Sequence, residues 1–227
     1  MRKAVLLLVV ALMAAPALGD AYIPGDFNGW DAFTQMTEGP ADFYSYAAHN
    51  DTPGRQQFVL LAEENNWDTK YIPSGDQWGF TDGLGDLDIT FDTATYSDGW
   101  YPETNRVGVS SWTTDWTAVG DWQGWDNGNP ATAMIDAGGG LFTYETTGLS
   151  VGEHWYKAVR TTTWDAVGAD GLSINAGDFS FNVSSESEIV TFSVDASSSI
   201  IRVDVVPEPT SLALLGIGGL ALLRRRR

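Results

Sequence analysis

Short alternations of apolar and polar residues fill the interior of the chain, and long apolar runs occur only near its two ends. The segments 141–146, 154–160, 179–183, 189–194 and 200–205 alternate or run apolar and lie between turn-forming Gly, Asn, Asp and Ser. A two-residue period with many β-branched and aromatic residues is typical of half-buried strands. No interior stretch of 12 residues shows helical periodicity. The pattern therefore predicts an all-β fold.

The apolar run near the N-terminus predicts a short helix with a targeting role. Two basic residues precede the run 4–14, and small residues follow it at 16–19. A positive start, a short apolar stretch and small residues are typical of a secretory signal peptide. We assign residues 1–21 to this signal and expect signal peptidase to leave a mature chain that begins near Asp20 or Tyr22.

The apolar run near the C-terminus, 212–223, is too short to span a bilayer comfortably. At about 1.5 Å per residue it falls well short of a hydrocarbon core of about 30 Å. By the positive-inside rule, the basic cluster after it should stay on the cytoplasmic side while the Pro-Glu-Pro segment before it faces outward. The residues of this arrangement are Pro207, Glu208, Pro209, Arg224, Arg225, Arg226 and Arg227.

Pro-Glu-Pro, a short apolar helix and an arginine cluster, in this order over 207–227, resemble the PEP-CTERM sorting signal of Gram-negative bacteria. The resemblance implies transient membrane insertion through the C-terminal helix and recognition by an exosortase-type membrane protease. It further implies release to the cell surface or the extracellular matrix. The alternative is an ordinary tail anchor followed by a basic stop.

A strong negative charge characterises the segment between the two signals. From residue 22 to residue 206, 28 acidic residues stand against 6 basic ones. Such a charge makes nucleic acid and anionic membranes poor partners. The chain contains no cysteine, so neither disulfides nor thiolate chemistry contribute. The fold must depend on its core, which 10 Trp, 8 Tyr and 10 Phe can supply.

An internal repeat divides the interior. Segment 25–31 reads Gly-Asp-Phe-Asn-Gly-Trp-Asp, and segment 120–126 reads Gly-Asp-Trp-Gln-Gly-Trp-Asp. Further pairs follow at offsets that drift from 95 to about 101: Met36 with Met134, Gly54 with Gly152, Trp67 with Trp164, and 89–91 with 190–192. We interpret the repeat as two homologous modules, residues 22–109 and 110–206, each long enough for a small antiparallel sandwich.

The second module shows a second resemblance, carried by segment 120–125, by Gly-Glu-His-Trp-Tyr-Lys at 152–157 and by Trp164. These motifs resemble those of early-set immunoglobulin-like carbohydrate-binding modules. That family includes the glycogen-binding domain of the AMP-activated kinase β subunit and the tandem starch-binding modules of pullulanases. The resemblance implies that the chain folds as two tandem immunoglobulin-like antiparallel β-sandwiches.

The same resemblance implies a carbohydrate site in which Trp125 and Trp164 stack against sugar rings and Lys157 binds sugar hydroxyls. An indole face covers the apolar C–H face of a pyranose, and a few polar groups read its hydroxyls. In the first module Trp30 and Trp67 match, but Val59 stands at the position of the lysine. The predicted partner is a polysaccharide such as an α-glucan or an exopolysaccharide.

Other readings of these residues stay open. A tryptophan in a Gly-Trp-Asp turn is also typical of a cap at a sandwich edge. His49 and His154 belong to different modules, and we expect surface or strand positions for them rather than metal ligation. The aspartates of the loop 82–88 lack the full spacing of a calcium loop. We therefore predict neither a metal site nor a cofactor.

Catalytic motifs are missing from the sequence. It contains no Gly-x-Ser-x-Gly, no His-Glu-x-x-His and no phosphate-binding glycine loop, although a carboxylate-pair glycosidase stays open. We predict a binding protein rather than an enzyme. The competing hypothesis is a structural surface or matrix protein without a sugar site. The two hypotheses differ in whether the two tryptophans of each module share one exposed face.

Overall fold

The computed structural model describes residues 20–40, 43–72, 75–94 and 105–207. Antiparallel strands dominate these residues, which confirms the predicted all-β sandwich fold. The described helices are three short 3-10 turns: η1 (Asp26–Asn28), η2 (Asp121–Gln123) and η3 (Pro130–Thr132). The apolar helices predicted near both termini lie outside the described residues. Within the part that the structure describes, no helix is both long and apolar enough to cross a membrane.

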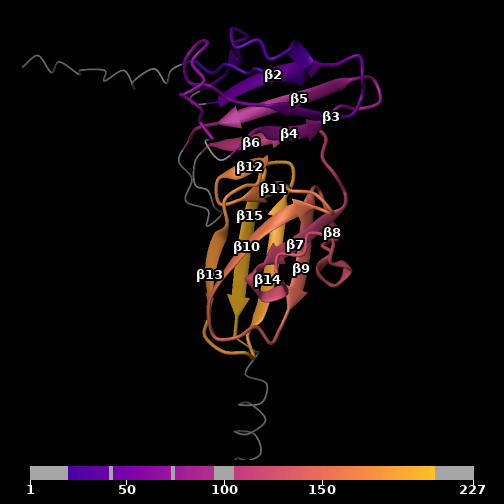
Figure 1. Cartoon of the computed structure of the whole chain (residues 1–227), viewed down its shortest axis with the longest axis vertical. Helices are drawn as coiled ribbons and strands as arrows, with labels where there is room; N and C mark the ends of the chain where they lie inside the picture. Colours follow the sequence, from indigo (N-terminus) through magenta and orange to yellow (C-terminus); the bar gives the residue numbers. More distant parts are fainter. Residues whose placement is uncertain (1–19, 41–42, 73–74, 95–104, 208–227) are drawn as a thin grey trace, which may run out of the picture.

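The first half of the chain forms a four-stranded sheet and a facing hairpin (top of Figure 1). The sheet has the order β1-β2-β5-β6, with β1 (Thr37–Glu38), β2 (Phe43–His49), β5 (Asp86–Asp92) and β6 (Arg106–Val109). The hairpin consists of β3 (Arg55–Phe58) and β4 (Gln77–Phe80). Isolated bridges from Tyr22 to Leu61 and from Gly25 to Phe58 add the N-terminal segment to it.

The second half repeats this arrangement with longer strands. One sheet has the order β15-β14-β9-β8, with β8 (Ile135–Gly138), β9 (Leu141–Thr146), β14 (Ile189–Asp195) and β15 (Ile200–Val206). The other contains β7 (Trp116–Gly120), β10 (Gly152–Arg160), β11 (Asp165–Gly168), β12 (Gly171–Ile174) and β13 (Phe179–Val183). In each half the chain leaves the four-stranded sheet after its second strand and returns at its third.

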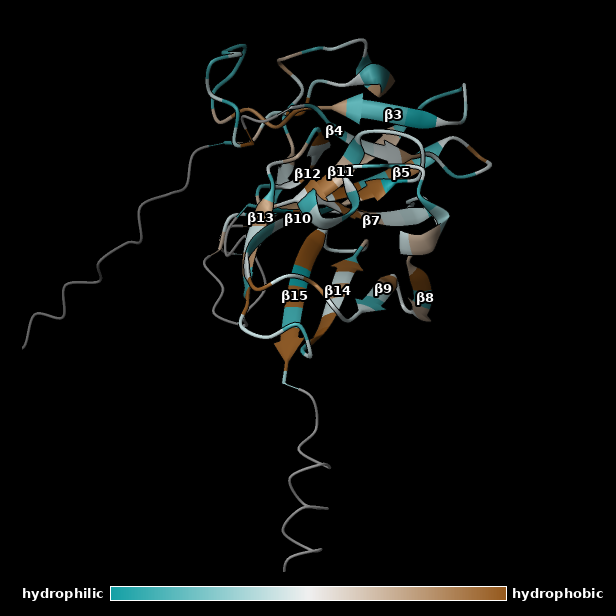
Figure 2. Cartoon of the chain, turned by 60° about the horizontal axis from the view of Figure 1, so that its bottom comes forward, coloured by the Kyte–Doolittle hydropathy of each residue, from teal (hydrophilic) through white to brown (hydrophobic). Residues whose placement is uncertain are grey.

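Alternation along the strands decides which residues enter the core. In β10, His154, Tyr156 and Ala158 are buried, while the intervening Trp155 is exposed. Figure 2 shows the same alternation as teal and brown bands along β15. Aromatic rings fill the space between the sheets: Phe192 lies 4.6 Å from Trp122 and 4.7 Å from Tyr156, measured between ring centroids. Much of the aromatic content therefore fills the core.

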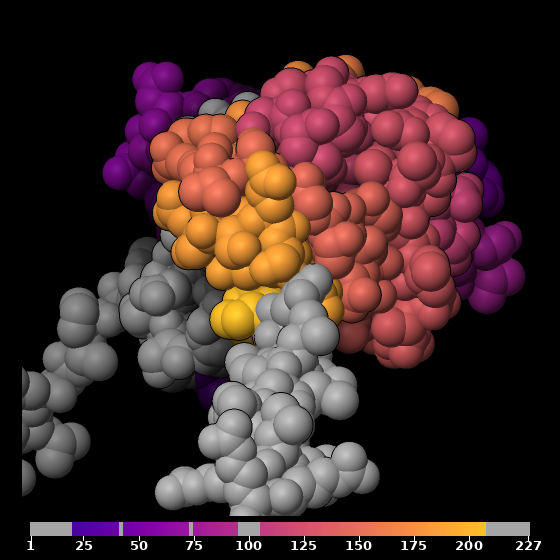
Figure 3. Space-filling model, turned by 90° about the horizontal axis from the view of Figure 1, so that it is seen from below, coloured from indigo at the N-terminus to yellow at the C-terminus, as the bar shows by residue number. Residues whose placement is uncertain are grey.

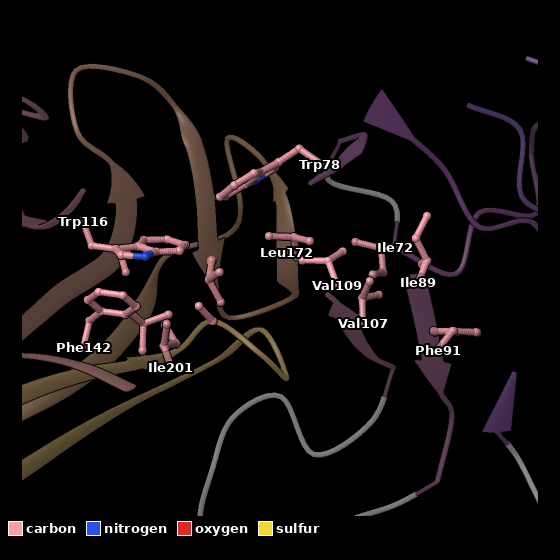
Figure 4. Packing of buried hydrophobic residues seen from close by; sticks show 14 of the residues in the cluster. Ile72, Trp78, Ile89, Phe91, Val107, Val109, Trp116, Phe142, Leu172 and Ile201 are labelled. Atoms are coloured by element: carbon pink, nitrogen blue, oxygen red, sulfur yellow. The ribbon is translucent and has the colours of Figure 1, made fainter. Parts of the chain in front are cut away.

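One apolar core runs through both halves. Trp78 of β4 is fully buried, and its ring centroid lies 5.7 Å from that of Trp116 in β7. Figure 4 shows these two rings with Leu172 of β12 and Val109 of β6 between the halves. Figure 1 places β12 directly below β4 and β6. In the space-filling view from below, the second half covers most of the face, and indigo residues appear only at the margin (Figure 3).

An ion cluster and a backbone hydrogen bond join the halves as well. Asp165, which is 4% exposed, accepts hydrogen bonds from Arg55 of the first half (Nε to Oδ2, 2.6 Å) and from Arg160 of its own half (Nε to Oδ2, 3.0 Å). The backbone N–H of Ile174 donates to the carbonyl of Asp76 at 2.8 Å. The relative position of the two halves is thus specified by polar contacts and not by apolar burial alone.

Ala21, the second described residue, belongs to this core. Ala21, which the predicted boundary assigns to the signal peptide, is fully buried and its carbonyl accepts a hydrogen bond from the N–H of Met36 at 2.8 Å. Asp20 is exposed. Cleavage before Asp20 would therefore retain a residue that the fold uses, whereas cleavage before Tyr22 would remove it.

Asp121 ties η2 to the central strand of the second half. Its Oδ1 accepts the Trp155 N–H at 2.8 Å, and its Oδ2 lies 2.9 Å from Nδ1 of His154. The Nε2 of His154 lies 2.8 Å from the Ser150 carbonyl oxygen. Both partners are acceptors, so the doubly protonated imidazolium satisfies both bonds. Burial lowers the pKa of His154, but the Ser150 carbonyl and the Asp121 carboxylate outweigh it and raise that pKa above 6.5.

The shared core predicts that Trp78→Ala destabilises the whole chain by about 3–5 kcal/mol, because it removes a fully buried indole. The control is Trp67→Ala, which removes an indole that is 42% exposed and should cost about 1 kcal/mol or less. Urea unfolding followed by near-UV circular dichroism checks both values. We expect a single transition. Two transitions, only one of which moves with Trp78→Ala, would contradict a shared core.

The His154 site predicts a pH-dependent contribution to stability. Because the folded pKa is raised, this contribution is present below the unfolded pKa and is lost as the pH rises through the folded pKa. The difference in melting temperature between the wild type and His154→Gln should therefore shrink from about pH 5 to about pH 9. His49→Gln is the comparison: two aspartates also raise the pKa of this imidazole, but it is exposed, so its difference should shrink over the same range from a smaller starting value. A His154→Gln difference that stays constant over this range would refute the assignment.

Candidate functional site

The turn after β7 places Trp125 on the outer face of the second half. Trp125 has a φ of 59°, uncommon for a residue other than glycine, and its N–H donates to the Gly120 carbonyl at 3.0 Å. A Cβ at Gly120 would lie 2.4 Å from the Trp155 carbonyl oxygen, so this close approach requires glycine. The half-buried indole packs on residues of four segments, namely β7, β10, β11 and the loop after β12: Val119, Val159, Ala166 and Ala176.

Lys157 of β10 lies between Trp125 and Trp164. Its Nζ is 5.5 Å from the ring centroid of Trp125 and 5.8 Å from that of Trp164, within the range of cation–π attraction. The ammonium also lies 2.7 Å from Oδ1 of Asp178 and donates to the Ala176 carbonyl at 2.9 Å. An ammonium carries three N–H donors, so one remains after these two contacts. The lysine and both indoles, predicted together from the sequence, therefore share one face.

The turn between β10 and β11 holds Trp164, which is 39% exposed. Thr162 in this turn has a φ of 66°, a strained conformation for a β-branched residue. Its N–H donates to the Asn127 carbonyl at 2.8 Å, and the Trp164 carbonyl accepts the N–H of Asn175 at 2.8 Å. The loops after η2 and after β12 thus fix the turn from two sides.

In the first half, Trp30 and Trp67 contact each other directly. Their ring centroids are 6.4 Å apart with an interplanar angle of 36°, and Trp67 is 42% exposed. Trp30 adopts a φ of 64° and its N–H donates to the Gly25 carbonyl at 2.9 Å, as Trp125 does to Gly120. The fully buried Val59 follows Phe58, which pairs with Gly25. It therefore occupies the register position of Lys157 and places an apolar side chain there.

Trp155 belongs to the candidate face, although the sequence analysis did not select it. It lies in β10 two residues before Lys157, so strand alternation puts both side chains on the same side of the sheet. It is 43% exposed. The alternation of segment 154–160 places Trp155 on the same side as Lys157, but the family motif assigns a role only to the lysine of this strand.

The aspartate of each repeated turn has a positioning role that the sequence analysis also missed. Asp26 accepts the N–H of Gln57 at 2.8 Å through Oδ2 and the indole N–H of Trp30 at 3.1 Å through Oδ1. Asp121 accepts the N–H of Trp155 in the same way. Each carboxylate thus ties its tryptophan turn to the neighbouring strand, and this explains the shared Gly-Asp that starts each repeat.

The remaining titratable candidates serve local structure. His49 lies 2.7 Å from Asp86 through Nδ1 and 3.2 Å from Asp51 through Nε2, and its hydrogen bonds to both raise its pKa. Asp82 accepts the backbone N–H groups of Asp86 and Leu84, which lower its pKa. Over the described ranges, no group of three or more His, Asp or Glu residues could hold a metal ion.

The model of the PEP-CTERM protein-sorting motif matches residues 205–227. The match confirms the predicted sorting signal. It identifies the chain as an exported protein that exosortase recognises, that is processed at the membrane and that is destined for the cell surface. No curated protein sequence matches the chain.

Among solved structures, the chain is similar to SusF from Bacteroides thetaiotaomicron, with 19% sequence identity and a TM-score of 0.34. The alignment covers 86% of this chain but 50% of that one, so the chain spans about half the length of SusF. A likeness this weak supports no statement about function, which therefore depends on the geometry of the candidate face.

Proposed function

We propose that this exported chain is a non-catalytic surface or matrix protein that binds a polysaccharide through the outer face of its second half. The observation that carries the proposal is the Lys157 ammonium held between the indoles of Trp125 and Trp164. Exposed apolar residues that gather on one face, rather than lie scattered, are typical of interaction sites. Here they lie beside a lysine and an aspartate, Asp178.

The chemistry of this face suits a sugar chain. The indole faces can cover the apolar faces of pyranose rings, while the free N–H of Lys157 donates to a hydroxyl. The Asp178 side chain is 37% exposed and can accept from another hydroxyl. Trp155 extends the aromatic surface along β10. Several weak contacts in a row favour a polymer over a single sugar.

The charge of the chain favours a neutral polymer. The acidic excess of the segment 22–206, 28 residues against 6 basic ones, repels anionic polysaccharides over a Debye length of about 8 Å at physiological salt. A neutral α-glucan or a neutral exopolysaccharide carries no such penalty. We therefore propose a neutral glucan as the preferred ligand.

We further propose that the chain consists of two early-set immunoglobulin-like modules, residues 22–109 and 110–206, that arose by duplication. The matching turns around Trp30 and Trp125, and the equal connectivity of the two four-stranded sheets, support this. The first module keeps the aromatic pair but has Val59 in place of the lysine. It would contribute a weaker second contact and gain avidity on a long polymer.

The alternative is a structural matrix protein without a sugar site. One observation favours it: Asp178 and the Ala176 carbonyl already satisfy two donors of the Lys157 ammonium within the protein. In that case the lysine and the indoles would only stabilise the surface of the sheet. The two functions differ in their binding of polysaccharide.

The proposed platform predicts that wild-type chain is retarded in native gels containing glycogen or amylopectin and that Trp125→Ala/Trp164→Ala is not. The full chain keeps its apolar terminal segments and is therefore run in a detergent. A polyoxyethylene detergent is used, because sugar-based detergents would compete for the binding site. The control, Phe33→Ala, removes a 58% exposed aromatic residue of the first half and should leave the retardation unchanged. If the wild type is retarded in none of the gels, including a gel that contains host exopolysaccharide, the structural alternative stands.

The central ammonium gives a separate prediction. Lys157→Met keeps most of the side-chain length but loses the charged donor, so the dissociation constant for a soluble α-glucan should rise about tenfold. Stability should fall by about 1–3 kcal/mol, because the Lys157 side chain is only 12% exposed and the Ala176 carbonyl loses this donor. Lys70→Met is the control, since it also removes a lysine paired with an aspartate, Asp76, at 3.4 Å, but lies in the first half. Equal affinities of both variants, measured by calorimetry, would remove Lys157 from the site.

A further inference from the structure

The turn that carries Trp164 lies at the junction between the two halves. Asp165, the next residue, is almost fully buried and directs its carboxylate at two arginines. Arg160 belongs to the same hairpin as the aspartate. Arg55 comes from β3 of the first half and binds both carboxylate oxygens. A two-point arginine–carboxylate contact fixes orientation as well as distance.

A second connection reaches the same turn through the backbone. The Trp164 carbonyl accepts the N–H of Asn175, and the preceding Ile174 donates its own N–H to the Asp76 carbonyl of the first half at 2.8 Å. The chains approach so closely here that a Cβ at Gly75 would lie 2.3 Å from the Ile174 carbonyl oxygen. Two residues in a row thus link Trp164 to the first half.

A third contact holds the strand that follows the turn. The indole N–H of Trp78 donates to the Ala166 carbonyl at 3.3 Å, although the two residues are 88 positions apart. Ala166 also forms part of the surface on which Trp125 packs. The first half therefore contacts the support of both tryptophans of the candidate face.

We propose that Arg55 is a positioning residue for Trp164, so that the polysaccharide site of the second half is complete only when the first half is docked. This inference rests on the proposed function. Without Arg55, Asp165 keeps Arg160 as its partner, and the carboxylate stays paired. The remaining pair lies within one hairpin and does not fix that hairpin relative to the first half. The turn then loses its two-point side-chain contact with the first half, while the backbone link through Ile174 and the Trp78 hydrogen bond keep the halves together.

The first test observes Trp164 without any ligand. The full chain is labelled with 5-fluorotryptophan in a polyoxyethylene detergent, and the Trp164 fluorine resonance is the one missing in Trp164→Phe. Arg55→Met should shift or broaden this resonance. Arg55→Lys keeps the charge but not the two-point contact and should move it less, in the same direction. The control, Arg202→Met, removes an arginine–aspartate pair within β15 and should leave it in place.

The second test measures binding of a soluble α-glucan by the same variants. Arg55→Met should raise the dissociation constant about tenfold without contacting the ligand, whereas Arg202→Met should not change it. An unmoved Trp164 resonance in both Arg55 variants overturns the proposal. If Arg55→Met does not fold, Arg55→Lys alone decides it by the same criterion. If the wild type binds no glucan, the proposed function fails, and the fluorine shift still decides whether Arg55 positions Trp164.

Discussion

The contact between the two halves, made by buried Trp78 and by the Arg55–Asp165 pair, is the interaction on which the rest of the structure depends. Apolar burial at this contact stabilises the docked halves but does not fix their relative orientation. The carboxylate held by two arginines fixes that orientation. A buried carboxylate is tolerable only because both oxygens are bonded. The halves are therefore not independent modules joined by a linker. They form one core with one relative orientation.

The geometry of the candidate face, formed by Trp125, Lys157, Trp164 and Trp155, depends on this contact. Trp164 and Trp125 are each carried by a turn with a residue at positive φ, which costs energy unless the surroundings enforce it. Hydrogen bonds from the loops after η2 and β12, and the Asp121 carboxylate, provide that enforcement. The Lys157 ammonium then holds the space between the rings. An aromatic surface with fixed spacing loses little entropy when a sugar chain binds to it.

Part of this organisation was predictable from the sequence. The two-residue alternation predicted strands of the second half, and the resemblance to early-set carbohydrate-binding modules grouped Trp125, Trp164 and Lys157, which the structure places on one face. The contact between the halves was not predictable, because Arg55 and Asp165 are 110 positions apart and no sequence pattern pairs them. Trp155 was missed for a different reason. Alternation places it correctly, but a short motif cannot show which outward residues stay exposed. The helices predicted near the termini lie outside the described residues.

The most direct test of the central claim is a fluorine NMR titration of the 5-fluorotryptophan-labelled chain with a neutral linear α-glucan. A glucan-binding face predicts saturable shifts of the Trp125 and Trp164 resonances, each assigned by substitution with Phe, while the resonances of the buried Trp78 and Trp116 stay fixed. Shifts confined to other tryptophans would place the ligand elsewhere on the molecule. No shift at any concentration would contradict a glucan-binding face and would favour a purely structural protein.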